Sequence, residues 1–289
     1  MKSLSLVVAT IGRDEEIKRL LDSLIAQTRS ADEIIIVDQN IDDRVEQVIS
    51  CYPCLPILRL RTPPMGANAA RNYGLKHVKC DLVGFPDDDC WYASNVIERV
   101  CCSFEDSQLC ALSGRVETSA DGISSGRWQT VEGSITRRNV WTTTIEFAAF
   151  FSTDLLVHIG GFDERIGPGA RSIYGAHEID DLFIRLLEYT DSAKYDPTIR
   201  INHNEPIRNY DFSTLNRAFR YGAGLGYVIK KHHYSPVVLF SFLARSLGGG
   251  LVSFVRREPG KGQFYLAVFL GRLFGWLFAN RCTVHGKDL

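Results

Sequence analysis

The chain reads Leu82-Val83-Gly84-Phe85-Pro86-Asp87-Asp88-Asp89-Cys90 at the point where its fold and its chemistry meet. The apolar run at residues 82–85 is typical of a buried strand, and three adjacent carboxylates follow it directly. Adjacent carboxylates repel one another, so a folded chain keeps them where water or a cation is close. Alternate residues of an extended segment point the same way, which places Asp87 and Asp89 on one face. This pattern predicts a site for a hard divalent cation, Mg²⁺ or Mn²⁺, and the alternative is a solvated acidic loop.

The sequence before this stretch alternates between strand and helix patterns. A continuous apolar run at residues 4–9 predicts a central parallel strand. Residues 33–37 and 57–60 predict a second and a third strand. Residues 13–27 carry apolar side chains three and four apart, which predicts a helix with one buried face, and residues 68–77 predict a shorter helix. This order predicts an α/β fold with a parallel sheet covered by helices.

Polar residues stand at three of the predicted strand ends, namely Thr10, Asp38 and Asp87. In open α/β sheets, ligands bind in the crevice at the carboxyl ends of the strands. The three residues are therefore expected to belong to one site.

The middle of the chain is less regular. Residues 109–117, 145–152 and 199–203 indicate further strands, and residues 177–188 indicate a helix. The polar, glycine-containing segment 119–138 predicts a mobile loop over the site.

The C-terminal part differs in charge from the rest. Residues 208–289 carry 12 Lys or Arg against 3 Asp or Glu, whereas the remainder carries 21 against 31. Two strongly apolar runs, 236–255 and 263–279, contain Arg245 and Arg272 respectively. A central Arg raises the free energy of a membrane-spanning helix by at least about 2.5 kcal/mol. We therefore expect helices that lie in the membrane interface with basic residues towards lipid phosphates, and the alternative is a helical cap packed on the rest of the protein.

The cysteines and the N-terminus indicate an intracellular protein. Eight cysteines are scattered along the chain, and Cys51 and Cys54 form the only pair with two residues between them. Because no second such pair or His pair follows, reduced thiols are expected rather than a zinc site. The apolar run at the start is too short for a signal peptide, so we expect a cytoplasmic location.

Taken in order, the motifs resemble glycosyltransferase family 2, the inverting enzymes with a GT-A fold, over residues 3–205. The segments that carry the resemblance are Val7-Val8-Ala9-Thr10-Ile11-Gly12-Arg13, Ile34-Ile35-Ile36-Val37-Asp38-Gln39-Asn40, Gly66-Ala67-Asn68-Ala69-Ala70-Arg71-Asn72-Tyr73-Gly74, Asp87-Asp88-Asp89 and Gly160-Gly161-Phe162-Asp163, followed by Glu178 at a helix start and His203 after the last strand. The resemblance implies a Rossmann-like mixed sheet flanked by helices in a domain at residues 1–207. A basic, apolar helical tail at residues 208–289 would follow it.

The resemblance implies a nucleotide-sugar donor bound at the strand ends. Asp38 would accept a hydrogen bond from the ring N–H of uracil or thymine. Arg71 would lie near the diphosphate, with a helix-surface salt bridge as its alternative role. Thr10, Arg13 and Asp88 would complete the donor contacts.

The resemblance also implies a metal shell around Mn²⁺ or Mg²⁺. Asp89 would hold the metal most directly, and Asp87 would contact the ribose or a metal-bound water. His203 would complete the shell or would be a structural residue. The metal would neutralise charge on the departing diphosphate.

The predicted helix start departs from the family pattern at the catalytic base. Family members usually carry Glu-Asp-x-Asp there, and the second carboxylate is commonly the base. In this chain Ile179 occupies that position, between Glu178 and Asp180. Either Glu178 is the base, or Asp180 reaches the site through a local shift, or catalysis is impaired. Asp181 and Arg185 have the spacing of a structural ion pair.

The function implied is transfer of one sugar, with inversion, from a UDP- or dTDP-sugar to a hydroxyl of a polyprenyl-diphosphate-linked saccharide. Bacterial surface-polysaccharide assembly at the cytoplasmic face of the inner membrane would be the setting, with the tail as a peripheral membrane contact. The chain lacks the Gln-x-x-Arg-Trp motif of processive polymerases, and no basic–aromatic pattern indicates nucleic acid. A sugar-nucleotide nucleotidyltransferase and a non-catalytic sugar-nucleotide-binding scaffold remain as alternatives.

Overall fold

The computed structural model describes residues 1–106, 108–117, 128–204 and 209–279, which form two compact units. The first unit combines Met1–Phe162 with Leu182–Glu205, and the second combines Asp163–Asp181 with Pro206–Leu289. The second unit therefore includes Asp163–Asp181, a segment that precedes the predicted domain boundary at residue 207. That boundary stays a prediction.

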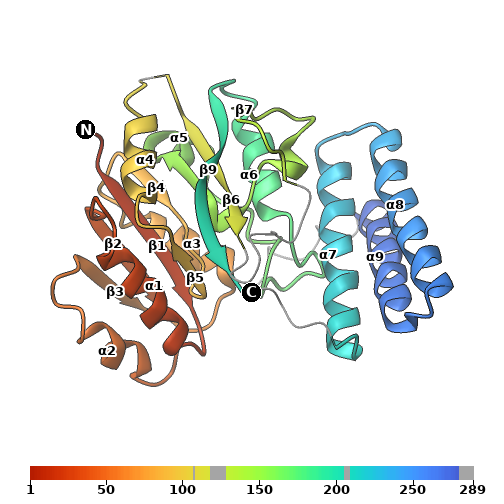
Figure 1. The fold of residues 1–289 in the computed structure, drawn as a ribbon, viewed down its shortest axis with the longest axis horizontal. Helices are drawn as coiled ribbons and strands as arrows, with labels where there is room; N and C mark the ends of the chain where they lie inside the picture. Colours follow the sequence, from red (N-terminus) through yellow and green to blue (C-terminus); the bar gives the residue numbers. More distant parts are fainter. Residues whose placement is uncertain (107, 118–127, 205–208, 280–289) are drawn as a thin grey trace, which may run out of the picture. The chain divides into compact units, whose positions relative to one another are not determined.

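The first unit is built on a mixed sheet with helices on both faces (Figure 1). In the described part of the chain its strands are β1 (Leu4–Thr10), β2 (Glu33–Asp38), β3 (Ile57–Arg61), β4 (Leu82–Gly84), β5 (Cys90–Tyr92), β6 (Ala111–Glu117), β7 (Gly133–Ser134), β8 (Ala149–Ser152) and β9 (Ala193–His203). The strand order is β3-β2-β1-β4-β8-β6-β9-β5, and β7 pairs with β9. The first four strands of this order are parallel, and β8 is antiparallel to both β4 and β6. The predicted α/β class is confirmed.

Six α-helices begin before residue 200 in the described residues. They are α1 (Glu15–Ile25), α2 (Arg44–Ile49), α3 (Ala67–Leu75), α4 (Val96–Ser103), α5 (Thr153–His158) and α6 (Glu178–Leu186), with short 3₁₀ helices at Val140–Thr142 and Glu146–Ala148. The start of α1 follows from its sequence, because the Asp14 side chain accepts the backbone N–H of Glu15 at the helix N-terminus.

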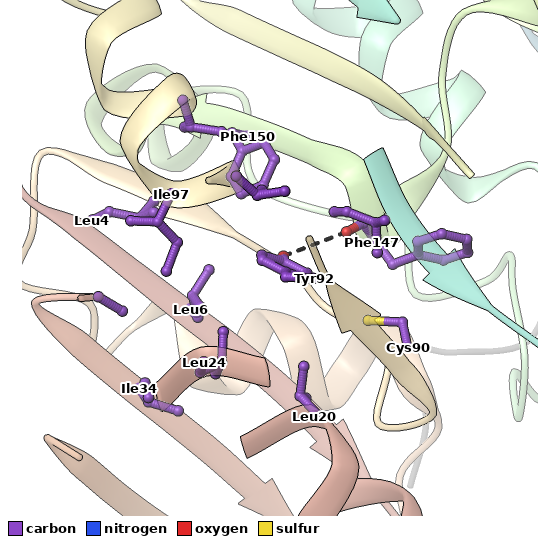
Figure 2. Packing of buried hydrophobic residues seen from close by; sticks show 14 of the residues in the cluster. Leu4, Leu6, Leu20, Leu24, Ile34, Cys90, Tyr92, Ile97, Phe147 and Phe150 are labelled. Atoms are coloured by element: carbon purple, nitrogen blue, oxygen red, sulfur yellow. Dashed lines mark hydrogen bonds between the residues drawn. The ribbon is translucent and has the colours of Figure 1, made fainter. Parts of the chain in front are cut away.

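Alternation along the strands divides the apolar side chains between two core layers. On one face, Leu4 and Leu6 of β1 and Ile34 of β2 pack with α1 and α4 (Figure 2). Tyr92 and Phe150 belong to the same cluster, and the Tyr92 hydroxyl donates to the Phe147 carbonyl at 3.4 Å. The opposite face of β1 and β2 is covered by α3.

Strand register brings the polar strand ends together. Thr10 and Asp38 are directly paired at the carboxyl ends of β1 and β2. In the antiparallel pairing of β5 with β9, Cys90 lies opposite His203. Asp89, one residue before Cys90, is therefore placed beside His203.

The observed elements extend several of the predicted ones. β9 begins at Ala193 and so is longer than the predicted strand at 199–203. Residues 146–148 form a 3₁₀ turn, so the strand predicted at 145–152 is confined to β8. Of the predicted loop at 119–138, residues 119–127 lie outside the described residues.

The second unit contains the helices α7 (Phe212–Lys231), α8 (Pro236–Val255) and α9 (Pro259–Phe278). Helices α7 and α9 approach each other backbone to backbone, because glycines on each face the other. A Cβ atom at Gly226 of α7 would lie 2.1 Å from the carbonyl oxygen of Arg272, and one at Gly275 of α9 would lie 2.0 Å from that of Ala223. Small residues permit this approach.

Among the described helices, α8 is the one that is long and apolar enough to cross a membrane by length and composition, with a mean hydropathy of 1.7. Only 28% of that stretch is buried inside the protein. Its large apolar side chains are therefore mostly exposed.

We expect Gly226→Ala to destabilise the helical unit by about 1–3 kcal/mol or more, because the added methyl group collides with the backbone of α9. Gly248 on α8 has no atom within 4 Å of the position that an added Cβ would take, so Gly248→Ala is the matched control. That control should stabilise its helix by up to about 1 kcal/mol, since Ala is the better helix former. Thermal unfolding followed by circular dichroism tests both, and an unchanged Tm for Gly226→Ala would contradict the tight contact.

Candidate active site

Two carboxylates and one imidazole converge at the edge of the sheet in the first unit. One potential ligand atom from each of Asp87, Asp89 and His203 lies within 4.8 Å of the others. Asp87 and Asp89 come from the loop between β4 and β5, and His203 is the last residue of β9. The predicted metal residues are thus brought together by a loop and a strand more than one hundred residues apart.

The hydrogen bonds of His203 orient its ring towards Asp89. Nδ1 lies 2.6 Å from the carbonyl oxygen of Asn204, which can only accept, so Nδ1 donates. Nε2 lies 3.0 Å from Asp89 Oδ1. This hydrogen bond raises the pKa of His203 and lowers the pKa of Asp89 below its usual value. This contact lies at the position where a cation could bind to both groups.

This donor set fits a hard divalent cation. Carboxylate oxygens suit Mg²⁺ and Mn²⁺, and a neutral imidazole with Nδ1 protonated presents the Nε2 lone pair to the metal. The carbonyl that holds Nδ1 acts as the outer partner that metal-binding histidines usually have.

Arg71 is a buried partner of the acidic loop. It is 4% exposed, and its Nη2 donates to Asp87 Oδ1 at 2.7 Å while Nη1 donates to Asn68 at 2.9 Å. The helix-surface salt bridge considered as its alternative role is not what the structure shows, because α3 turns this side chain inward. The guanidinium holds Asp87 in place, and its contact with a diphosphate stays a prediction.

Thr10 and Arg13 contact the other two carboxylates of the triplet. The Thr10 hydroxyl donates to Asp88 at 2.8 Å, and Arg13 Nη2 lies 3.3 Å from Asp89. Burial raises the pKa of Asp88 to about 7. The charges of Asp87 and Asp89 raise this pKa further, and the hydrogen bond from Thr10 lowers it. Its hydrogen bond with Thr10 directs Asp88 to the end of β1. Asp89 instead contacts His203, and Asp87 contacts Arg71.

Asp38 is fully buried and its carboxylate already has four donors. Oδ1 accepts the backbone and side-chain N–H groups of Asn40 at 2.9 and 2.8 Å. Oδ2 accepts Nε and Nη2 of Arg59 at 2.9 and 2.8 Å. The structure places Asp38 at the predicted edge, and recognition of a base by it stays a prediction.

Arg19 is a residue of this site that the sequence patterns do not indicate. Its Nη2 donates to the backbone carbonyl of Asp89 at 2.8 Å, and its guanidinium lies 4.1 Å from the ring centre of Trp91. With the Asn204 amide turned to accept, both terminal nitrogens of Arg19 also reach Asn204, at 3.1 and 3.2 Å. Arg19 thereby ties the acidic loop to the end of β9. In sequence it is one more polar position on an amphipathic helix, so no signal distinguished it.

The candidate bases belong to the second unit. Glu178 and Asp180 are both buried at the start of α6, and Asp180 Oδ2 lies 2.6 Å from His177 Nδ1. Ile179 is also buried, 4% exposed, in the position where the family usually has a carboxylate. The two acids stay candidates.

An ion-pair network in the second unit anchors the residue that follows these acids. Asp181 is fully buried and lies 2.6 Å from Lys231 and 2.7 Å from His232 at the end of α7. Lys231 also pairs with Asp163 at 2.8 Å. Burial opposes ionisation of Asp163, but hydrogen bonds from Arg165 and Lys231 outweigh it, so its pKa lies well below the usual range.

Arg185, four residues after Asp181, donates to the carbonyls of Ile159 and Gly161 at 2.8 and 2.6 Å. It stabilises the Gly160-Gly161 turn of the first unit. These contacts of both residues are structural, and the ion pair between them that their spacing indicates stays a prediction.

Comparison with known proteins identifies the family. The model of glycosyl transferase family 2 matches residues 5–160, more than half of the chain, and the chain belongs to this family. The glycosyltransferase AglE of Haloferax volcanii is 25% identical over 178 residues, 57% of each protein. An uncharacterized glycosyltransferase of Haemophilus influenzae is 36% identical over 98 residues, 34% of this chain and 33% of that protein. The chain therefore matches about half, or less, of the length of these relatives.

Solved structures show the same fold at low sequence identity. Mannosyltransferase PcManGT from Pyrobaculum calidifontis, in complex with GDP-Man and Mn²⁺, has a TM-score of 0.66 at 16% identity, over 94% of this chain and 87% of that one. Residues 1–349 of TarS from S. aureus, in complex with UDP-GlcNAc, have a TM-score of 0.60 at 14% identity, over 99% and 94%. The predicted GT-A fold is confirmed.

We expect Asp89→Asn and His203→Ala each to weaken Mn²⁺ binding by about 100-fold or more, because the first removes a carboxylate charge and the second the imidazole of the predicted metal cluster. Arg19→Gln should weaken it by about 10- to 100-fold, as outer partners of metal ligands usually do. Asp42→Asn, on the exposed surface of the same unit, is the control. Titration calorimetry with MnCl₂ measures all four variants, and equal affinities for Asp89→Asn and the control would exclude a metal at this cluster.

Proposed function

We propose that this protein is an inverting glycosyltransferase that moves one sugar from a nucleotide-sugar to a hydroxyl of a lipid-linked saccharide. The observation that carries the proposal is the convergence of Asp87, Asp89 and His203 at the carboxyl edge of a GT-A sheet. Membership in glycosyl transferase family 2 supports it.

The donor side of the reaction falls to the first unit. Asp87, Asp89 and His203 would hold Mn²⁺ or Mg²⁺, which neutralises charge on a diphosphate leaving group. Arg13 is 40% exposed at its side chain and lies beside this cluster, so its guanidinium is available to phosphate oxygens. Thr10 and Asp88 border the same edge.

A UDP- or dTDP-sugar is the proposed donor. Recognition of the base by Asp38 requires a rearrangement, because both of its oxygens already accept two hydrogen bonds. Displacement of Asn40 from Oδ1 would leave the ion pair with Arg59 intact and free one acceptor for a ring N–H. Support from the similar structures is general, since one was solved with GDP-Man and another with UDP-GlcNAc.

The acceptor side requires a general base, and Glu178 is the proposed one, with Asp180 as the alternative. A carboxylate can take the proton of the acceptor hydroxyl as that oxygen attacks the sugar carbon opposite the departing diphosphate. Asp180 already has His177 at 2.6 Å, which ties its carboxylate to that ring. Glu178 is preferred because it is the first acid of the helix.

We expect Glu178→Gln to lower kcat by about 10²- to 10⁴-fold, since it removes a general base, while the affinity for the donor stays unchanged. Glu188→Gln, an exposed position just after α6, is the control for the same chemical change. Donor binding is measured by calorimetry with UDP-, dTDP- and GDP-sugars, with Mn²⁺ and with chelator, and turnover by nucleotide release.

The outcomes separate the alternatives. Full turnover in Glu178→Gln and its loss in Asp180→Asn would assign the base to Asp180. Metal-dependent binding of a nucleotide-sugar without turnover by the native protein would favour a non-catalytic scaffold. Absence of binding to every nucleotide would exclude a glycosyltransferase.

We further propose that the helical unit holds the protein at the cytoplasmic face of the inner membrane, in the assembly of a surface polysaccharide. Exposed apolar side chains on α8 support this location, among them Phe240 at 65% and Leu251 at 68%. Arg245 stands near the middle of α8, which favours a helix lying in the interface over one that spans the bilayer.

We expect the double change Phe240→Glu and Leu251→Glu to abolish most binding to vesicles that contain anionic lipid, because carboxylates do not enter the interface readily. Ile41, which is 93% exposed on the first unit, provides the control Ile41→Glu. Co-sedimentation with vesicles measures the bound fraction. Equal binding by the double variant and the native protein would place the membrane contact elsewhere.

A further inference from the structure

A cavity of about 410 Å³ lies within the second unit, between α7 and α9. Its lining on α7 includes Arg217 and Tyr221. Its lining on α9 includes Phe264, Val268 and Arg272. The residue before α6, His177, also lines it. The metal cluster of the first unit contributes nothing to it. The cavity is thus a second candidate binding site.

The lining contains several basic residues. Arg217, Arg272 and His177 are basic, and the hydroxyls of Ser213 and Thr214 add further polar groups. Of the described residues that line the cavity, none is acidic. Guanidinium groups of this kind suit phosphate oxygens.

Arg272 is the lining residue whose buried positive charge is least offset by its neighbours. Its Nη1 donates to the Phe242 carbonyl at 2.6 Å and to the Ser246 hydroxyl at 2.5 Å, both on α8. Its Nε is buried without a hydrogen-bond partner, and no carboxylate of the described residues pairs with this guanidinium. Burial, with repulsion from Arg245, lowers the pKa of Arg272 to about 10. A buried cation without a counter-charge is unfavourable, and an anion in the cavity would offset it.

The lining also contains apolar and aromatic side chains. Phe264 and Val268 form a wall on α9, and the Tyr221 ring lies 4.9 Å from the Arg217 guanidinium, which also donates to the Tyr221 hydroxyl at 2.9 Å. Leu266 and Leu270, also on α9, are each 47% exposed. A ligand that combines an anionic group with a hydrocarbon chain matches both the basic and the apolar residues of the lining.

His177 connects the cavity to the candidate bases. Its Nδ1 lies 2.6 Å from Asp180, and its backbone has a φ of +75°, which is unusual for a residue other than glycine. Such a conformation persists only where the surrounding structure holds it, and it is common at functional sites. A ligand in the cavity therefore contacts a residue that touches the acidic motif of α6.

We propose that this cavity binds the diphosphate of the lipid-linked acceptor, with Arg217 and Arg272 on the phosphate oxygens and Phe264 and Val268 against the start of the lipid chain. The proposal rests on the proposed function, because it names the place where the acceptor of that reaction is held. It assigns the helical unit a role in substrate binding in addition to membrane attachment.

The test measures binding of farnesyl diphosphate, farnesol and inorganic diphosphate to the full chain by calorimetry. Chelator is present throughout, so that diphosphate does not bind through a metal at Asp87 and Asp89. We expect farnesyl diphosphate to bind more tightly than either fragment. Arg217→Gln should weaken its binding about tenfold or more, since each charged hydrogen bond to phosphate contributes on this scale.

Controls keep the test decisive. Arg256→Gln, an exposed position on the second unit outside the cavity, should bind like the native protein. Arg272→Gln should lose binding further, but its contacts with α8 are structural, so the exposed Arg217 carries the test if the Arg272 variant unfolds. Affinities that are equal in Arg217→Gln and Arg256→Gln would overturn the proposal, as would farnesol or inorganic diphosphate binding as tightly as farnesyl diphosphate.

A measurement of donor binding distinguishes failure of this proposal from failure of the proposed glycosyltransferase function on which it rests. Metal-dependent nucleotide-sugar binding that persists in Arg217→Gln, together with unchanged farnesyl diphosphate binding, would overturn only the assignment of the cavity. If the native protein does not bind any nucleotide-sugar, the proposed function itself is wrong.

Discussion

The antiparallel pairing of β5 with β9 is the constraint on which the candidate metal site depends. This register sets Cys90 opposite His203 and so brings Asp89 within 3.0 Å of the imidazole. Because successive residues of a strand point to opposite faces, a slip of one residue would turn His203 away from the carboxylates. Arg19 adds a second link, since it reaches both the Asp89 carbonyl and Asn204. The cluster is therefore held from both chain segments before any metal arrives.

In the second unit, close packing of helix backbones at glycines is the main constraint on the arrangement of α7 and α9. Its two main helices meet through glycines, so that their backbones lie closer than side chains would allow. In the same unit, α8 keeps its large apolar residues mostly exposed, and Arg272 is among the residues that line a cavity. One helical arrangement thus presents an apolar surface and a cationic pocket, which together suit an anionic amphiphile.

Sequence reasoning located the strands and the polar strand ends well, because a parallel sheet buried on both faces requires continuous apolar runs. It placed Asp87 and Asp89 on one face by the alternation of an extended segment. It joined His203 to them only through a resemblance, since that proximity depends on pairing between distant segments. It did not identify Arg19, whose role arises from contacts with a carbonyl and an aromatic ring that no spacing reveals. It also assigned Arg71 an alternative on the helix surface, whereas packing of α3 on the sheet buries this side chain.

Local patterns in the sequence determined the elements, their order along the chain and the acidic character of the loop after β4. These follow from periodicity and residue type, which act over a few neighbouring residues. Tertiary structure alone decided which partners the charged groups have: Arg59 and Asn40 for Asp38, Lys231 and His232 for Asp181, and, within the described residues, none for the Nε of Arg272. The physical reason is that a side chain satisfies its charge or its hydrogen bonds with whatever the fold brings within about 3 Å, and that choice is made between segments far apart in sequence.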